Sequence, residues 1–527
     1  MERMLGVLVD CSRNGVPTVD TVKKYAQIIK KMGYNTLMLY TEDTYEIDNQ
    51  PYFGHLRGRY SKEELKSIDR FCREIGIELV PCIQTLAHLE NMFKWVSEYS
   101  DVNDCDNILL AGDEKTYLLI EDMISSLSQC FTSRKIHIGM DEAHRMGTGK
   151  YQQIHGIEDR FDIFNKHLHR VCNIAGKYGF EPMMWSDMFY RLAMNTEGGC
   201  TEVDFDKIFK KAALPQNISL VYWNYYSTDY NRYADCIKIN KKFGRKVYFA
   251  GGAWTWKGFA PDNAFSIKAT EAAFKACNDC GVDGMFVTEW GDDGAECSVF
   301  AALPSLMYAA EVANGNTDME SIKSKFKVIT GCNFESFMLL DKLDGGVPNR
   351  ENSPAKYLLY NDLFMGIRDC RCTKGMGLHY KKLAEEIHNI ENKGAFYEMF
   401  DSYEKLALVL EVKAELGIKT REAYLQRDIP ALEKIVAEYD TFIERLKNFH
   451  EAYEKRWFKE NKPHGFDVQD IRLGGLLQRA LSCKKRLLQI INGEISQIPE
   501  LDEPVLNEIN GPDHWNKIVT ANSLFHI

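Results

Sequence analysis

Two adjacent carboxylates, Asp141 and Glu142, are the residues of this chain best suited to acid–base chemistry. They end an apolar run that begins at Lys135 and is typical of a β-strand. Neighbouring residues at a strand tip face opposite ways, so the two carboxylates would point in different directions. One could protonate a leaving oxygen while the other stays negative beside the reacting centre. The pair alone is a weak signal, because many Asp-Glu pairs are solvated surface residues.

Tryptophans stand at matching places in the chain. Four of the 8 tryptophans follow or end four successive apolar runs, namely Trp185, Trp223, Trp254 and Trp290. Indole faces stack on the apolar faces of sugar rings, while acids and arginine bind the hydroxyl groups. One such tryptophan would usually belong to the core, but four together favour a sugar pocket.

A sugar pocket with paired carboxylates predicts cleavage of a glycosidic bond. Two neighbouring acids cannot flank that bond as the ordinary acid and nucleophile do. They suit a mechanism in which the 2-acetamido group of the substrate supplies the nucleophile.

Eight short apolar runs alternate with amphipathic stretches over the first three-fifths of the chain, which is typical of parallel strands covered on both faces. Eight strand–helix units predict a (β/α)8 TIM barrel, whose catalytic groups lie at the carboxyl ends of the strands. A doubly wound sheet is the alternative, but no G-x-G-x-x-G follows the first run. The runs are 4–10, 35–40, 77–83, 135–141, 181–187, 218–224, 246–252 and 284–290.

The composition changes after Asn314, where Glu, Lys, Leu and Ala with helical periodicity become frequent. We therefore predict a catalytic barrel over residues 1–317 and a mostly α-helical C-terminal domain over residues 318–527. The helical part concentrates no set of acid, base and nucleophile, so we expect a packing platform or the interface of a homodimer.

The formal net charge of -11 argues against general binding to nucleic acid or to membranes. The 15 cysteines lack the spacing of a disulfide framework, which favours reduced thiols. The chain shows no signal peptide and no 20-residue apolar span. We expect a cytoplasmic protein with a carbohydrate as its partner.

Several motifs resemble those of glycoside hydrolase family 20, the β-N-acetylhexosaminidases. HIGMDEAH at 137–144 resembles the H-x-G-G-D-E signature, and DCSR at 10–13 resembles a first-strand D-x-S-R. Trp290-Gly291-Asp292 is similar to W-G-E, and His88 lies where the family ends its third strand in a histidine. The whole chain resembles a bacterial branch of the family built as a barrel plus a helical domain.

The resemblance implies a role for each matching residue. Glu142 would be the general acid/base, and Asp141 would orient the acetamido nitrogen and stabilise the oxazolinium intermediate. Glu42 or Asp43 would back His88, which supports the acid. The sugar would be bound through its hydroxyl groups by Arg13 and Asp292, and its N-acetyl group would be boxed by Trp185, Trp223 and Trp290.

The sequence departs from the family pattern in three places. Met140 replaces the second glycine of the signature. Most family barrels follow a small α+β domain, whereas this sequence opens on its first strand, so we expect that domain either to be absent or to lie outside this sequence. The family's tyrosine that bonds the acetamido carbonyl follows the seventh strand, but Thr255 follows Trp254 here. We assign that role to Tyr225, with Tyr226 as the alternative.

The sequence thus predicts an exo-β-N-acetylhexosaminidase that removes terminal GlcNAc or GalNAc with retention and without a metal or organic cofactor. A non-catalytic amino-sugar-binding barrel is one alternative, although such a protein has no need of a general acid. A metal-dependent barrel hydrolase is another, because four residues near the signature are ordinary ligands: His137, Asp141, Glu142 and His144. The H-x-H typical of barrel metallohydrolases does not occur on the first strand.

Overall fold

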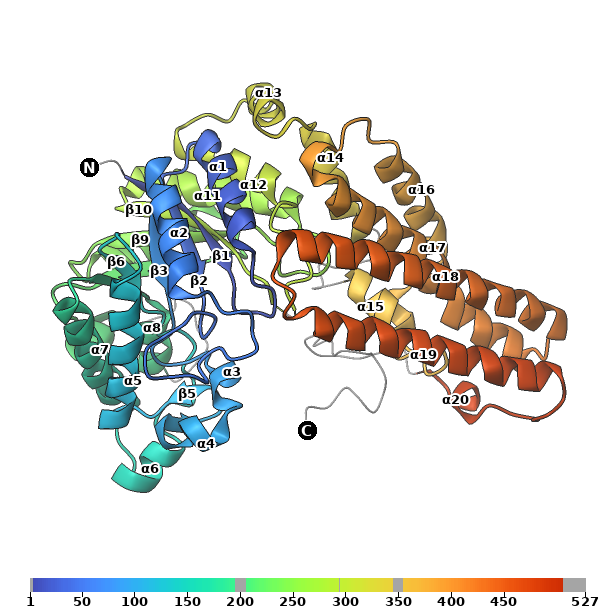
Figure 1. The fold of residues 1–527 in the computed structure, drawn as a ribbon, viewed down its shortest axis with the longest axis horizontal. Coiled ribbons are helices and arrows are strands. Elements are labelled where there is room, and N and C mark those ends of the chain that lie inside the picture. Colours follow the sequence, from blue (N-terminus) through green and yellow to red (C-terminus); the bar gives the residue numbers. More distant parts are fainter. Residues whose placement is uncertain (1–2, 195–204, 293, 345–353, 506–527) are drawn as a thin grey trace. The chain divides into compact units, whose positions relative to one another are not determined.

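The computed structural model describes residues 3–194, 205–292, 294–344 and 354–505 of the chain. Its N-terminal part is a closed barrel of parallel strands, as the sequence predicts (Figure 1). Each barrel strand pairs with the next barrel strand along the chain, and the last pairs with the first to close the barrel. The strands are β1 (Met4–Asp10), β2 (Thr36–Tyr40), β3 (Glu78–Cys82), β6 (Lys135–His137), β7 (Glu181–Trp185), β8 (Ser219–Trp223), β9 (Val247–Gly252) and β10 (Gly284–Glu289).

Helices follow the strands and cover the outside of the barrel (Figure 1). Local signals set their ends: the Thr18 side chain caps the first helix, and Gly33, at φ 107°, ends it. Ser61 and Glu64 form a capping box at the next helix. The helices are α1 (Val19–Met32), α2 (Lys62–Glu74), α5 (Glu114–Ser128), α7 (Arg160–Lys177), α8 (Asp187–Met194), α9 (Phe205–Lys211), α10 (Tyr230–Lys241), α11 (Asn263–Cys280) and α12 (Leu303–Ala313).

Two of the connections carry small elements of their own. The segment between β3 and β6 contains the short helices α3 (Glu90–Phe93) and α4 (Val96–Tyr99). It also forms an antiparallel pair, β4 (Asn103–Cys105) and β5 (Ile108–Leu109), and α6 (Lys150–His155) precedes α7. The sequence patterns did not predict these insertions, because elements of two to six residues show no measurable periodicity.

The C-terminal part is helical, as predicted. Its three longest helices pack in sequence, α17 against α18 and α18 against α19 (Figure 1). Asp428 caps α18, where Pro430 stands in the first turn. The helices are α13 (Met319–Thr330), α14 (Phe334–Met338), α15 (Pro354–Tyr360), α16 (Met376–His388), α17 (Tyr397–Leu425), α18 (Ile429–Glu460), α19 (Phe466–Ile491) and α20 (Pro499–Asp502).

The contacts divide the chain into two compact units that do not follow chain order. The barrel unit consists of Met1–Trp254, Ala264–Gly291 and Ser305–Lys325. The helical unit consists of Thr255–Asn263, Asp292–Pro304 and Phe326–Ile527, so it includes the segments that follow β9 and β10. The boundary between residues 317 and 318 stays a prediction.

Thirteen cysteines in the described ranges have free thiols, including the close pairs at 277/280 and 370/372. Cys236 is joined in a disulfide, so the expectation of reduced thiols does not hold for this residue. Among the helices that the structure describes, none combines the length and apolar character needed to cross a membrane.

Candidate active site

The loop after β6 presents the two carboxylates with an irregular backbone. The strand ends at His137, although the apolar run extends to Asp141, and φ is positive at Gly139 (69°), Met140 (72°) and Glu142 (49°). A left-handed backbone cannot continue a strand, and in residues other than glycine it is uncommon and concentrates at functional sites. The positive φ at Met140 gives a physical reason for the glycine of the family signature at this position. Met140 itself is fully buried.

Asp141 lies between two hydrogen-bonding side chains. Its Oδ1 accepts a hydrogen bond from Nε2 of Gln84 at 2.7 Å, and its Oδ2 is 3.3 Å from Nε2 of His88. Burial acts to raise the pKa of Asp141, but the charge and hydrogen bond of His88 and the Gln84 amide outweigh it and lower the pKa to about 2. Asp141 is therefore ionised at neutral pH.

His88 contacts both carboxylates of the pair. Its Nε2 lies 3.7 Å from Oε2 of Glu142, in addition to its ion pair with Asp141. Burial acts to lower the pKa of His88, but the charge of Asp141 outweighs it, and the pKa rises to about 9. The charged imidazolium thus lies beside the predicted acid/base and its neighbour.

Glu142 is the most open member of the cluster, with 40% of its side chain exposed. Its Oε1 lies 3.6 Å from a guanidinium nitrogen of Arg191, and its backbone N–H donates to Oδ2 of Asp187 at 3.4 Å. Arg191 and Asp187 form an ion pair of 3.2 Å on α8. Burial, followed by the charge of Asp141, raises the pKa of Asp187 to about 7 in spite of Arg191. Two further charged groups therefore act on the predicted acid.

The two acids predicted to back His88 differ in their partners. Oε1 of Glu42 accepts hydrogen bonds from Arg13 at 3.3 Å and from the Tyr40 hydroxyl at 3.0 Å. Burial raises the pKa of Glu42 to about 7, against the opposing charges of Arg13 and His88. Asp43 instead forms a 3.0 Å ion pair with Arg57. Of the two acids, Glu42 is the one whose charge acts on His88.

The aromatic residues at the strand ends form two connected groups. Trp185 is only 1% exposed and lies 6.2 Å, between ring centroids, from Trp290. Trp223 stacks on Tyr225 at 5.2 Å, and the Trp254 indole N–H donates to the Tyr225 carbonyl at 2.8 Å. The side chain of Tyr225 also hydrogen-bonds with Trp290, which links the two groups. The four strand-end tryptophans do converge on one end of the barrel.

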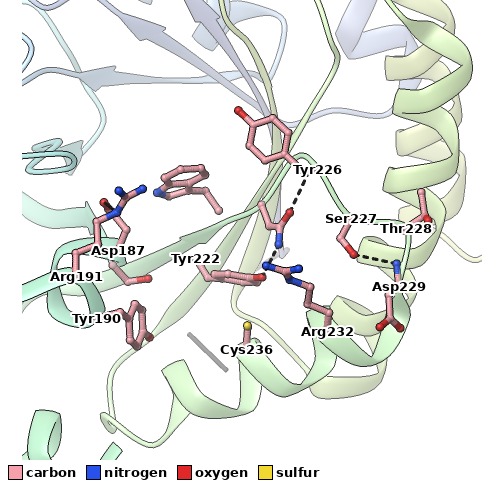
Figure 2. A pocket seen from close by; sticks show the side chains of 13 residues that line it. Asp187, Tyr190, Arg191, Tyr222, Tyr226, Ser227, Thr228, Asp229, Arg232 and Cys236 are labelled. Carbon is pink, nitrogen blue, oxygen red and sulfur yellow. Dashed lines mark hydrogen bonds and ion pairs between the residues drawn. The ribbon is translucent and has the colours of Figure 1, made fainter. Parts of the chain in front are cut away.

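The two tyrosines proposed for the acetamido carbonyl differ in exposure. Tyr225 is buried at 5% exposure, whereas Tyr226 is 59% exposed and packs edge-on against Trp254 at 5.5 Å. Figure 2 shows Tyr226 at the margin of a pocket, with Asp187 and Arg191 on another side of it. This pocket has a volume of about 500 Å³, within the range of small-molecule sites, and Trp223 and Asn224 also line it.

Asp292, predicted to bind sugar hydroxyls, begins the segment Asp292–Pro304 that belongs to the helical unit. Its neighbour Gly291 belongs to the barrel unit, where its N–H donates to Oδ2 of Asp10 at 2.9 Å. The role of Asp292 stays a prediction.

No group of three or more His, Cys, Asp or Glu side chains in the described part of the chain has the arrangement of a metal site. His137 is fully buried, packs 4.3 Å from the Trp185 ring and has a pKa lowered by burial to about 3. It is a neutral core histidine beneath the site.

Sequence reasoning missed four side chains of this cluster. Gln84 and Asp187 stand directly after strands, where position alone could have drawn attention to them, and Arg191 follows Asp187 by one helical turn. Tyr40 is the last residue of β2 and belongs to the apolar run 35–40, so its type and position drew no attention to it. Their contacts become visible only when the strand ends meet around the barrel.

A barrel with paired carboxylates at the carboxyl ends of its strands, within a ring of tryptophans, defines the site of a glycoside hydrolase. The family profile described as "Glycosyl hydrolase family 20, catalytic domain" matches residues 5–311, more than half of the chain, and the chain belongs to this family. A second profile, "Glycoside Hydrolase 20C C-terminal domain", matches residues 335–519.

Among curated proteins, Hexosaminidase D of Bos taurus is 24% identical over 266 residues, which cover 48% of this chain and 70% of that protein. Hexosaminidase D of Homo sapiens is 23% identical over 224 residues, covering 40% of this chain and 42% of that protein. Among solved structures, β-N-acetylhexosaminidase from Bacteroides fragilis is 19% identical with a TM-score of 0.47, covering 61% of this chain and 68% of that one.

Proposed function

We propose that this glycoside hydrolase is an exo-β-N-acetylhexosaminidase that cleaves terminal β-linked GlcNAc or GalNAc by a retaining, substrate-assisted mechanism. The observation that carries the proposal is the difference between the two neighbouring acids. Asp141 is held ionised by His88 and Gln84, while Glu142 is open to solvent beside it. A fixed anion and an accessible acid are the two groups that this reaction requires of the protein.

In the first step Glu142 gives its proton to the glycosidic oxygen as the bond from that oxygen to the anomeric carbon breaks. The acetamido oxygen of the substrate forms the new bond to that carbon. The resulting oxazolinium carries a positive charge near its nitrogen, where the ionised Asp141 accepts the N–H and stabilises the charge. Glu142, now ionised, takes a proton from water, which attacks the anomeric carbon and opens the ring with net retention.

The remaining predicted residues would bind and orient the sugar. Arg13, fixed by Glu42, would hold hydroxyl groups, and Asp292 would hold others from the segment after β10. Trp185, Trp223 and Trp290 would enclose the N-acetyl group, and Tyr225 would bond its carbonyl. Trp254 would also bind the sugar. The reaction as written needs no metal or organic cofactor.

The cellular setting is also proposed. The net charge of -11 argues against binding to nucleic acid or to membranes, and the free thiols of thirteen cysteines in the described ranges support a cytoplasmic protein. The long helices of the C-terminal unit would support a homodimer.

The test is release of nitrophenol from an aryl β-N-acetylglucosaminide and from the matching aryl β-glucoside, with a thiazoline that mimics the oxazolinium. We expect hydrolysis of the acetamido sugar only, inhibition by the thiazoline, and no effect of EDTA. Equal rates on both sugars would overturn substrate assistance, because the glucoside has no acetamido group. Inhibition by EDTA would favour the metal-dependent alternative, and thiazoline binding without any turnover would favour a non-catalytic barrel.

A further inference from the structure

Gln84 occupies the centre of the hydrogen-bond network at the carboxyl end of the barrel. It lies just beyond β3, and its side chain is completely buried. Its amide nitrogen donates to Oδ1 of Asp141 at 2.7 Å and to the Tyr40 hydroxyl at 2.8 Å. Its amide oxygen accepts the backbone N–H of Met140 at 3.1 Å. A backbone N–H is always a donor, so this bond fixes the orientation of the amide and directs its NH2 toward Asp141.

The loop that carries the acids is shaped around this amide. A Cβ at Gly139 would lie 2.1 Å from Oε1 of Gln84, closer than any side chain could approach, and φ there is +69°. Only glycine allows both this backbone and this contact. The Gln84 amide is therefore in direct contact with the backbone of the loop that carries the acids.

An amide differs from an acid at this position in one decisive respect. A carboxylate there would face Asp141 within hydrogen-bonding distance, and the two acids could bond only by sharing a proton. The amide does not titrate, so its N–H donates to Asp141 at every pH. A donor to an ionised carboxylate stabilises the charged form and limits its rotation.

The network continues from Gln84 toward the predicted sugar-binding arginine. The Tyr40 hydroxyl accepts from Gln84 and donates to Oε1 of Glu42, which accepts from Arg13. The residues proposed to hold the hydroxyl groups and the acetamido group are thus joined by hydrogen bonds that are buried at the centre and part-buried at the ends, which restrains their separation.

We propose that Gln84 is a positioning residue, whose amide N–H holds the Asp141 carboxylate ionised and correctly oriented for the acetamido group. The inference rests on the proposed function, because it assigns Gln84 to the step in which Asp141 takes part. Other titratable groups also act electrostatically on Asp141, from the strands, loops and helix packed around it: Tyr40, Cys82, His88, His137, Asp187 and Tyr225. Glu142 follows it in the chain. All of these remain in the variants below.

The experiment compares Gln84→Glu and Gln84→Met with the wild type in kcat and KM on the aryl β-N-acetylglucosaminide across pH 4 to 9. For Gln84→Glu we expect kcat to fall about 10- to 100-fold at pH 7 to 8, with a smaller change in KM, and to recover toward low pH. The recovery occurs because the protonated acid can donate as the amide does. For Gln84→Met we expect a similar loss without recovery, because the thioether cannot donate.

A control variant and the melting temperatures of all variants separate this role from a structural one. Gln153→Glu, on the exposed face of α6, should leave both the rate and the pH profile unchanged. The melting temperatures show whether each variant folds. Equal losses in both Gln84 variants at every pH, or a wild-type profile in Gln84→Glu, would overturn the proposal.

The titration of the Asp141 carboxyl, followed by 13C NMR with Asp141→Asn for assignment, does not depend on turnover. We expect the Asp141 titration to move to higher pH in Gln84→Glu. If the wild type does not hydrolyse the aminosugar but this shift occurs, the proposed function fails and the effect of Gln84 on Asp141 stands. If the wild type is active and the titration and rate profile are unchanged in Gln84→Glu, the inference fails and the proposed function stands.

Discussion

Both compact units bury charged side chains, but they arrange them differently. In the helical unit, Glu296 forms ion pairs with Lys356 at 2.5 Å and with Arg472 at 2.7 Å, and no side chain of this trio is more than 10% exposed. Each charge there faces an opposite one. At the barrel end, four acids lie around His88 and two arginines, and Glu142 is 40% exposed.

In the barrel cluster, four of the ionisable groups have strongly shifted pKa values. Those of Glu42 and Asp187 rise to about 7, that of His88 rises to about 9, and that of Asp141 falls to about 2. Fully paired buried charges hold a fold together. In the barrel, burial raises the pKa values of Glu42 and Asp187, and the attraction between Asp141 and His88 shifts the pKa of each, which is typical of a functional site. The comparison predicts that removing a charge costs activity in one unit and stability in the other.

The largest expected effect is on the rate. Glu142→Gln should lower kcat on an aryl β-N-acetylglucosaminide by about 10³-fold, because the amide cannot give a proton to the leaving oxygen. Steady-state kinetics measure this, and the melting temperature should stay near that of the wild type. Glu114→Gln, whose side chain is 74% exposed, is the matched control. Turnover at the wild-type rate in Glu142→Gln would remove the general acid from the proposed mechanism.

In the helical unit, removal of a buried charge is expected to lower the stability of the fold. Glu296→Gln removes the carboxylate that forms ion pairs with Lys356, 1% exposed, and with Arg472, so the free energy of unfolding should fall by about 3–5 kcal/mol. Denaturant unfolding followed by circular dichroism measures this. The exposed Glu451→Gln should have no detectable effect. If Glu296→Gln lowered the free energy of unfolding no more than Glu451→Gln does, the proposed difference between the two clusters would be wrong.

The third effect is a dependence of stability on pH. Asp187 has a pKa near 7 in the fold and near 4 when unfolded, so the folded state binds the extra proton between these values. Its contribution to stability is therefore lost as pH rises from about 4 to about 7. Asp187→Asn should flatten the decline of the unfolding free energy in that window by up to about 1.4 kcal/mol per pH unit.

Unfolding curves at several pH values, measured for wild type and Asp187→Asn together, isolate this group, because Glu42 titrates alike in both. Parallel curves between pH 4 and 7 would show that Asp187 is not protonated in the fold.

The smallest effect concerns the backbone at the active site. Met140→Ala and Met140→Gly remove the same buried side chain, but alanine keeps a Cβ at φ +72°. Met140→Gly should therefore be the more stable of the two by about 1 kcal/mol, although both lose stability relative to the wild type. The difference in melting temperature between Met140→Ala and Met140→Gly measures the backbone strain at this position. If Met140→Ala were the more stable variant, the positive φ would cause no strain.

Much of the barrel could be predicted because its signals are local. Apolar runs such as that of β1 are buried along their whole length, and the alternation of strands with capped helices leaves few topologies. The acids after β6 and the strand-end tryptophans could be predicted for the same reason, since carboxyl ends of parallel strands gather at one end of a barrel. The early end of β6 could not be predicted, because the positive φ values at Gly139 and Met140 depend on Gln84 and on the neighbouring strand.

The sequence by itself determined the fold class and the family motifs, and it predicted the two candidate acids, because each depends on residue type and on spacing along the chain. Only the tertiary structure decided which groups act on those acids. Gln84 and Tyr40 are distant from Asp141 in the chain yet belong to one buried network, and Arg191 reaches Glu142 from α8. The physical reason is that the pKa and orientation of a carboxylate depend on burial and on contacts within a few ångströms, which exist only after the barrel has closed.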